Sequence, residues 1–289
     1  LKSSRMLAFL LWNLCFFLSM LVTNDVALIT FVPFTLIIAD SMKDRIKESV
    51  TLTIVVMQTI AANLGSMLTP IGNPQNLYLS GMSGMGTWDI VKLMFPYSAA
   101  AFIMLAIWIA IIAFRNRRYK ASSDVIMYAA LFIVSLLAVM RVIHYALPFA
   151  LVVICMAIFD RKNFTGIDYS LLGTFAALFI FIGNIGRIGA FNEWMQNIVT
   201  GREIMVSAAA SQIMSNVPAA ILLSGFTDNI QGLIVGTNIG GLGTLIASMA
   251  SLISFRYVAG TGRSCGKYLA IFTISNLIFL AVMIGISAI

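Results

Sequence analysis

The sequence predicts an all-α, polytopic membrane protein, and three observations lead to this fold class. Only 10% of the 289 residues are charged and 60% are hydrophobic, whereas about 25% of the residues of a soluble domain are charged. The apolar residues form runs of helical length, interrupted by Gly, Pro and Asn rather than alternating with polar residues as in a membrane barrel. The basic residues cluster between those runs. We therefore expect a lipid bilayer around the chain and, despite a net charge of +7, no nucleic-acid partner.

Seven apolar runs are long enough to cross a bilayer. The hydrocarbon core is about 30 Å thick, and about 20 helical residues are needed to cross it. Prolines and a glycine interrupt the first of these runs, so we expect a broken transmembrane helix there. The expected crossings are 49–85, 88–114, 124–140, 142–159, 169–186, 230–255 and 268–288.

Two further apolar stretches, 6–39 and 203–227, are predicted to be re-entrant hairpins. Polar residues cut each stretch near its middle, and in the first they leave the arms 6–22 and 26–39, of 17 and 14 residues. At about 1.5 Å per residue neither arm comfortably spans the core. Each stretch is therefore expected to enter and leave the membrane on one side.

The basic loops predict an orientation in the cytoplasmic (inner) membrane. With the run 115–120 in the cytoplasm, 14 of the 18 Lys and Arg residues fall on the cytoplasmic side, as the positive-inside rule requires. The hairpin 6–39 then enters from the cytoplasm, and the hairpin 203–227 enters from outside. Opposite entry of two similar elements is the mark of an inverted repeat.

A repeat is also visible in the residues themselves. The segment 62–76 aligns without gaps on the segment 237–251, and a hairpin tip precedes each segment. The order of tip and Asn-x-Gly segment is the same in both halves. The aligned pairs include Asn63 with Asn238, Gly65 with Gly240 and Thr69 with Thr244.

The repeat divides the chain into two predicted domains, 1–120 and 121–289. Because three helices precede the hairpin of the second domain and none precedes that of the first, we expect about three further N-terminal helices outside this chain. The first domain comprises the hairpin 6–39, the broken helix 49–85 and the helix 88–114. The second comprises three helices within 124–186, the hairpin 203–227 and the helices 230–255 and 268–288.

The densest polar break in an apolar run lies at 69–76. Two prolines and a glycine free backbone groups there, and in the membrane such groups must be buried in protein or line a water-filled cavity. A half-helix beginning at this point presents its positive end to an anion, while freed carbonyls can hold Na⁺. A proline kink satisfied by neighbouring helices is the simpler alternative. The candidate residues of this break are Thr69, Gly72, Asn73, Gln75 and Asn76.

Each hairpin tip carries a hydroxyl residue followed by Asn. Asp25 follows the first such pair and is the acid set well inside an apolar stretch, so it is a candidate coupling carboxylate. The simpler interpretation of both tips is capping of the next half-helix, and that of the Gly-rich segment 236–244 is close helix packing. The candidates at the tips and on the Asn-x-Gly segments are Thr23, Asn24, Asp25, Ser215, Asn216, Asn63, Asn238, Gly240 and Thr244.

Four segments carry a family resemblance: LVTNDVALITFVPF (21–34), TPIGNPQNLYL (69–79), SQIMSNVPAAILL (211–223) and GTNIGGLGTLIAS (236–248). They resemble the ion transporter superfamily, in particular bacterial permeases related to the arsenite permeases and the divalent anion:sodium symporters. The resemblance covers essentially the whole chain. It implies inverted repeats, two tips that meet near mid-membrane, a homodimer, and elevator-like movement of a transport domain against a scaffold.

The same resemblance implies one Na⁺ site at each tip and no other cofactor. Carried over, the first site would combine Asn24 with the segment around Asn63, Thr69 and Gly72. The third tip positions are Asp25 and Val217, where the sodium symporters have Thr, and Asp25 makes H⁺ a possible coupling ion beside Na⁺. The second site would combine Ser215 and Asn216 with Asn238, Gly240 and Thr244.

These observations predict a secondary active transporter of a small anion or oxyanion, coupled to Na⁺ or H⁺ through the tips. An arsenite or antimonite exporter is one alternative, because Asn-rich sites suit an uncharged polyol-like solute. A Na⁺/H⁺ antiporter that uses Asp25 is another. An intramembrane enzyme is disfavoured, since no second buried acid or buried Ser/His pair accompanies Asp25 in the sequence.

Overall fold

The computed structural model describes residues 4–41, 47–111, 177, 180–181, 184 and 188–288. Within these ranges every regular element is a helix, as the sequence predicts. The chain forms two compact units, 1–118 with 182–289 and 119–181. The helices expected at 124–140, 142–159 and 169–186 fall almost wholly outside the described residues. All candidate site residues belong to the first unit.

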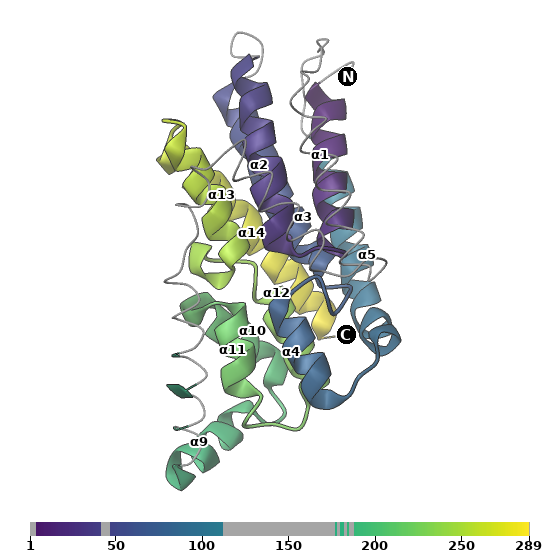
Figure 1. The fold of residues 1–289 in the computed structure, drawn as a ribbon, viewed down its shortest axis with the longest axis vertical. Coiled ribbons are helices and arrows are strands. Elements are labelled where there is room, and N and C mark those ends of the chain that lie inside the picture. Colours follow the sequence, from purple (N-terminus) through teal and green to yellow (C-terminus); the bar gives the residue numbers. More distant parts are fainter. Residues whose placement is uncertain are drawn as a thin grey trace, which may run out of the picture. The chain divides into compact units, whose positions relative to one another are not determined.

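The first apolar stretch forms two helices joined by a short turn. Helix α1 (Ser4–Ser19) and helix α2 (Asn24–Ser41) pack against each other and against the next helix of the chain (Figure 1). The turn falls at the polar residues that the sequence singles out. Trp12 and Leu28 are completely buried, so the pair belongs to the interior of the unit.

The predicted broken helix is present. Helix α3 (Glu48–Ser66) ends before Pro70 and Gly72, and helix α4 (Pro74–Ser83) begins with a proline in its first turn, where the missing N–H costs nothing. Fifteen of the residues of α3 are buried, so this helix is a central element of the unit. Helix α5 (Thr87–Ile111) follows and matches the expected crossing at 88–114.

The C-terminal part also contains a helix pair followed by a broken helix and a long helix. The second apolar stretch again forms two short helices joined at a tip, and the helix expected at 230–255 is broken between 240 and 248. One 3₁₀ turn, η2, lies within that break. The elements are α9 (Gly189–Val199), α10 (Glu203–Met214), α11 (Asn216–Leu223), α12 (Ile230–Ile239), η2 (Leu245–Ala247), α13 (Met249–Gly260) and α14 (Cys265–Ser287).

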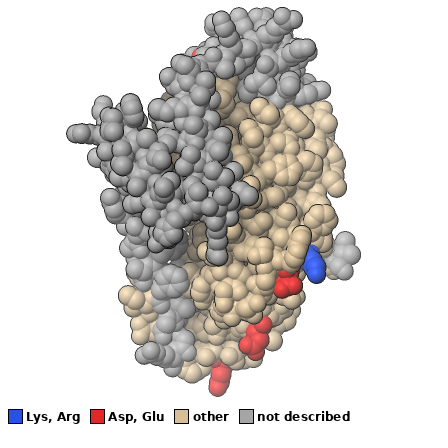
Figure 2. Space-filling model, turned by 45° about the vertical axis from the view of Figure 1, so that its right-hand side comes forward, with Lys and Arg blue, Asp and Glu red and all other residues tan. Residues whose placement is uncertain are grey.

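Three described helices are long and apolar enough to cross a membrane: α3, α5 and α14. On α5 and α14 large apolar side chains remain more than half exposed, among them Ile103, Ile107, Ile274 and Ile278. Figure 2 shows a face on which most of the described surface is uncharged, with several charged side chains at its lower end. An uncharged apolar surface of this kind is suited to contact with lipid.

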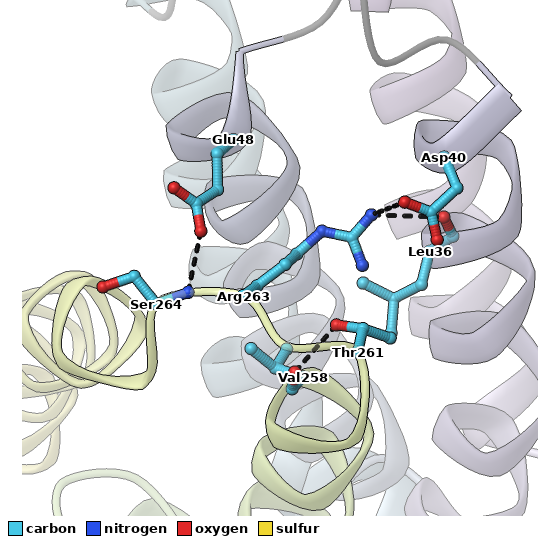
Figure 3. Close-up of polar contacts among 7 residues, drawn as sticks. All are labelled: Leu36, Asp40, Glu48, Val258, Thr261, Arg263 and Ser264. Atoms are coloured by element: carbon cyan, nitrogen blue, oxygen red, sulfur yellow. Dashed lines mark hydrogen bonds and ion pairs between the residues drawn. The ribbon is translucent and has the colours of Figure 1, made fainter.

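Polar contacts join two loops at one end of this unit (Figure 3). Arg263, in the turn between α13 and α14, donates through Nη2 to Asp40 Oδ1 at 2.7 Å. Glu48, at the start of α3, accepts from the backbone N of Ser264 at 2.7 Å and from Lys267 Nζ at 3.2 Å. The last turn of α2, the start of α3 and the turn after α13 therefore lie at one end of the unit.

The start of α10 and the end of α11 lie together at the opposite end of the unit. Glu203 Oε1 accepts from Thr227 Oγ1 at 2.9 Å and from Gly201 N at 3.0 Å. Met85, between α4 and α5, and Gln231, at the start of α12, both line a cavity of about 510 Å³. Helix α3 thus starts at the Asp40–Arg263 end, whereas α12 starts at the other end (Figure 1).

Candidate functional site

The two broken helices meet through their aligned asparagines. Asn63, on α3, accepts through Oδ1 from Ser248 Oγ at 2.9 Å. Asn238, on α12, accepts through Oδ1 from Asn73 Nδ2 at 2.9 Å. Ser248 and Asn73 occupy the same position, directly before the second half of each broken helix, with φ/ψ of −144°/139° and −139°/140°. Each helix therefore contacts the other through an equivalent pair of side chains.

The remaining amides of the first break also converge on Asn238. Its Nδ2 donates to Asn76 Oδ1 at 2.5 Å and to Ile234 O at 2.7 Å. Gln75 Nε2 lies 3.5 Å from its Oδ1. Asn76 Nδ2 in turn donates to the carbonyls of Met67 and Thr69, both at 3.2 Å, so this side chain satisfies two backbone groups that the break frees.

The first tip is bonded to the first break. Asn24 donates from its backbone N to Gly72 O at 3.1 Å and from Nδ2 to Asn63 Oδ1 at 3.1 Å. Thr69 Oγ1 donates to the carbonyl of Met20, and Gly72 N donates to Thr69 Oγ1 at 3.1 Å. The first tip, the first break and Asn63 thus form one hydrogen-bonded group. Asn63 and Asn238, through which the two broken helices contact each other, are called the crossing asparagines below.

The second tip is bonded to the second break in a similar way. Thr244 Oγ1 donates to Gln212 O at 3.0 Å, and Gln212 lies four residues before the tip Asn216, just as Met20 lies four residues before Asn24. Ser215 Oγ lies 3.5 Å from Ala247 O and 3.4 Å from Asn216 Oδ1. The contacts of Ser215 are long, so this hydroxyl is weakly held.

Capping explains one tip and not the other. Thr23 Oγ1 accepts from Val26 N at 3.3 Å, which is an N-cap contact of α2. The cap predicted at Ser215 is wrong: its side chain accepts no backbone N–H of α11, because the hydroxyl is turned toward the second break. Among the described residues other than glycine, positive φ occurs at Thr23 (149°) and Ser215 (75°), so both tips hold a backbone conformation that favours glycine.

Close packing of small residues is confirmed at the Asn-x-Gly segments. A Cβ on Gly65 would overlap Phe16 O on α1, and a Cβ on Gly240 would lie 2.7 Å from Ala208 Cα on α10. A Cβ on Gly72 would overlap Ser66 O. Gly65 and Gly240 let the backbone of each broken helix approach the neighbouring helix pair, and Gly72 lets the break fold back on the end of α3, so the packing interpretation and the site interpretation both apply.

Three buried polar atoms of this region have no hydrogen-bond partner: Asp25 Oδ1, Asn63 Nδ2 and Gln75 Oε1. An unmade buried hydrogen bond costs about 1–3 kcal/mol, so such atoms together mark a place that a ligand can satisfy. They comprise a carboxylate oxygen, an amide donor and an amide acceptor. Among the described residues no group of three or more His, Cys, Asp or Glu side chains could hold a metal ion.

The predicted candidates fall into two tip groups and one crossing. The crossing is the place where the two broken helices contact each other, and it is formed by Asn63, Asn73, Gln75, Asn76 and Asn238. The second break is lined by Gly240 and Thr244. Sequence reasoning missed Ser248 and Gln212. Ser248 could have been found, because it aligns with Asn73 in the repeat. The first group comprises Thr23, Asn24, Asp25, Thr69 and Gly72, and the second comprises Ser215, Asn216, Gly240 and Thr244.

Comparison with known proteins identifies the family. The model of the CitMHS family, described as citrate transporter, matches residues 1–232. The chain is 36% identical to the uncharacterized transporter MJ0456 of Methanocaldococcus jannaschii, over 99% of this chain and 80% of that protein. It is 30% identical to the inner membrane protein YbiR of Escherichia coli, over 83% of this chain and 66% of that protein.

Proposed function

Because the chain belongs to the CitMHS citrate transporter family, we propose that it moves a small anion or oxyanion across the cytoplasmic membrane by secondary active transport. Family membership makes it a membrane transporter, with a bilayer and a small-molecule substrate as its partners, and confirms the resemblance to the ion transporter superfamily. The substrate class proposed is the carboxylate anion, of which citrate is the family's example.

The observation that carries the proposal is the set of unpartnered buried polar atoms at the first tip and on the two halves of the first broken helix. Asn63 Nδ2 is a buried donor that an anion can accept from, and Asp25 Oδ1 is a buried carboxylate oxygen that a cation can satisfy. Broken helices bind anions at half-helix N-termini and cations at freed carbonyls. Donor and acceptor within one region therefore favour joint binding of an anion and a cation.

Asp25 supplies a physical reason for coupling. An unneutralised carboxylate repels an anion, and the repulsion is strong in a medium of low dielectric constant. Binding of Na⁺ or H⁺ at Asp25 removes that charge, so a cation raises the affinity for the anion. By thermodynamic linkage the anion then raises the affinity for the cation to the same degree.

Matched contacts support the inverted repeat. In each half the Thr of the break donates to the carbonyl four residues before the tip Asn, and the Gly two residues after the crossing Asn packs on the preceding helix pair. The crossing contacts of Asn73 and Ser248 are also equivalent. Shared features at several aligned positions are hard to obtain by chance similarity of apolar segments.

The positions of the helix ends support two re-entrant hairpins of opposite entry. The outer end of α2 lies beside the turn between α13 and α14, through Asp40 and Arg263. The outer ends of α10 and α11 meet through Glu203 and Thr227, at the opposite end of the unit. With basic loops on the cytoplasmic side, the pair α1–α2 enters from the cytoplasm and the pair α10–α11 from outside.

Elevator-type alternating access is part of the proposal. Its support is that both tips, both breaks and the crossing belong to one compact unit. The homodimer that the family resemblance implies stays a prediction.

Cation exchange is a second candidate function. The unpartnered Asp25 Oδ1 favours it, since a lone intramembrane carboxylate is the group an antiporter uses to exchange Na⁺ for H⁺. This alternative needs no anion site, so it leaves Asn63 Nδ2 without an explanation.

The experiment that tests the proposal is ligand-induced thermal stabilisation of the purified protein. Citrate, dicarboxylates, sulfate, phosphate and arsenite are screened with Na⁺, with choline in its place, and over a range of pH. A ligand that binds the native state raises the unfolding temperature. The expected result is a carboxylate anion that stabilises more when Na⁺ or H⁺ is supplied. Stabilisation by cations alone would favour exchange, and stabilisation by arsenite without a cation effect would favour a metalloid exporter.

A further inference from the structure

The second tip contains a side-chain amide where the resemblance leads one to expect a cation. Gln212 Nε2 lies 2.8 Å from Gly240 O, 2.9 Å from Leu242 O and 3.1 Å from Ala208 O. The first two carbonyls belong to the break after α12, and the third belongs to α10. One –NH₂ group with two hydrogens therefore serves three converging backbone oxygens.

Converging carbonyls from a broken helix are the ligands that membrane proteins offer to monovalent cations. The amide hydrogens of Gln212 carry a partial positive charge and bond to these carbonyl oxygens, as a cation would, although the side chain has no net charge. Because the hydrogen bonds are of normal length, Nε2 occupies the space that these three carbonyl oxygens share. A cation cannot occupy that point while Gln212 keeps this conformation.

The break is folded around this side chain. Gln212 Oε1 accepts from Thr244 N at 2.9 Å, so both ends of the amide bond to the break. Gly243 has a φ of 105°, and a Cβ there would overlap Gln212 Oε1. Glycine is therefore needed beside the amide for both conformation and space.

The crossing asparagine of this half also has no vacant ligand atom. Asn238 Oδ1 accepts from Asn73 and, at 3.5 Å, from Gln75, while its Nδ2 donates to Asn76 and Ile234. An amide oxygen that already accepts two donors has little capacity to bind a cation. The predicted Na⁺ ligand role of Asn238 therefore does not fit, and neither does that of the Asn63 amide oxygen, which accepts from Asn24 and Ser248.

The first tip differs at the corresponding position. Met20 stands where the second half has Gln212 and brings no amide. Asn76 bonds the carbonyls of Met67 and Thr69 there, but Asp25 Oδ1 remains buried without a partner. The first tip thus keeps an anionic oxygen for a cation, whereas the carbonyls of the second are occupied by protein.

We infer that the Gln212 amide replaces the coupling cation at the second tip, so that the chain holds a cation at the Asp25 tip alone. The inference rests on the proposed cation-coupled transport and sets its stoichiometry.

Thermal unfolding in an Asp25→Asn background isolates the second tip. Asp25→Asn, Asp25→Asn/Gln212→Ala and the control Asp25→Asn/Gln196→Ala, which truncates an exposed glutamine of α9, are titrated with Na⁺, NH₄⁺ and choline. The Asp25→Asn protein and the control should show the same response to Na⁺ and NH₄⁺ as to choline. The protein that lacks Gln212 should unfold at a lower temperature, and Na⁺ or NH₄⁺ should restore part of the loss because they fill the vacated carbonyl group. Gln212→Met, which copies Met20, replaces Gln212→Ala should the latter fail to fold.

Two results would overturn the inference. One is Na⁺-specific stabilisation of Asp25→Asn that Asn216→Ala removes, since the second tip would then bind a cation beside Gln212. The other is a Gln212 variant that folds and shows no cation response. Neither result depends on an anion, so the proposed anion transport can fail in the ligand screen while this inference stands, and the reverse is also possible.

Discussion

The first and second tips share their architecture and differ in which of their polar atoms are satisfied. In both, a Thr of the break donates to a carbonyl four residues before the tip Asn, and a glycine packs on the helix pair. At the first tip Asp25 Oδ1 is buried and unpartnered. At the second, Gln212 occupies the carbonyls of the break with its own amide. A repeated backbone therefore does not imply a repeated ion site.

The difference shows which observation identifies a binding site. The motif of hydroxyl residue and Asn is present at both tips, and it gives the same expectation for both. Among the described residues, three of the buried atoms without partners belong to Asp25, Asn63 and Gln75, on the side of the first break, whereas the second break has Ser251 Oγ, on α13, and no unpartnered charged group. Unsatisfied polar atoms distinguish the tips because a native structure tolerates them mainly where a ligand binds.

The largest effect is expected from Asp25→Asn. The amide keeps the shape of the side chain and removes the negative charge, so a cation no longer relieves repulsion of the anion. Stimulation of citrate binding by Na⁺ or by acidification should fall from the about 5–150-fold typical of coupled ligands to none. Cation titrations of citrate binding measure this. Stimulation equal to that of the wild type would place coupling at a residue other than Asp25.

Gly65→Ala should be more damaging than Gly240→Ala. Its Cβ overlaps a backbone oxygen, Phe16 O, whereas a Cβ on Gly240 lies 2.7 Å from Ala208 Cα. Overpacking costs about 1–3 kcal/mol, occasionally more, and we expect Gly65→Ala to exceed Gly240→Ala. Gly81→Ala is the control, since no atom lies within 4 Å of its Cβ and alanine favours the helix. Thermal unfolding in detergent ranks the three, and an equal loss at Gly81 would argue against close packing.

The crossing should be more sensitive at Asn73 than at Ser248. Asn73→Ala removes the donor at 2.9 Å from Asn238 and the acceptor of Ser66 Oγ at 2.9 Å, and exposing such buried partners costs about 1–3 kcal/mol. After Ser248→Ala, Asn63 Oδ1 still accepts from Asn24, while Ala250 N loses the side-chain acceptor that caps α13, so we expect about 1 kcal/mol. Unfolding of both variants by heat tests the order. A larger loss for Ser248→Ala would show that Asn63 depends mainly on the second break.

The smallest effect is expected from Ser215→Ala. The hydroxyl lies 3.4–3.5 Å from its nearest acceptors and caps no helix, so its removal should change the unfolding free energy by less than about 0.5 kcal/mol. Thr23→Ala, which removes the contact with Val26 N, should cost about 1 kcal/mol, as loss of an N-cap usually does. Paired unfolding curves compare them, and a reversed order would mean that Ser215 has a stronger partner than the structure gives it.

Local features of the sequence account for most of the fold. Pro70, Gly72 and Pro74 predict the end of α3 and the start of α4, because two prolines and a glycine within five residues remove backbone donors and disfavour a continuous helix, whereas the isolated Pro33 and Pro96 remain inside α2 and α5. The alignment of 62–76 with 237–251 likewise predicts that tips and breaks belong together. These predictions need only the residues of one segment or a comparison of two.

The parts of the site that could not be predicted depend on contacts between distant segments. In the sequence, Gln212 is one polar residue in an apolar arm. Its role depends on hydrogen bonds to carbonyls 28 and 30 residues away. The missing partner of Asp25 Oδ1 is equally invisible in the sequence, since it depends on every neighbour. Hydrogen-bond satisfaction is a property of the folded chain.

The most direct test of a single cation site at the first tip is the number of cations bound with the anion. Purified protein is saturated with citrate in alkaline buffer, where citrate itself is fully ionised, and radioactive Na⁺ retention and proton uptake are measured on the same sample. We expect the Na⁺ and H⁺ taken up to total about one per chain, and to vanish in Asp25→Asn, because a carboxylate binds a single charge. A total of two in the wild type, with one retained in Asp25→Asn, would contradict the account.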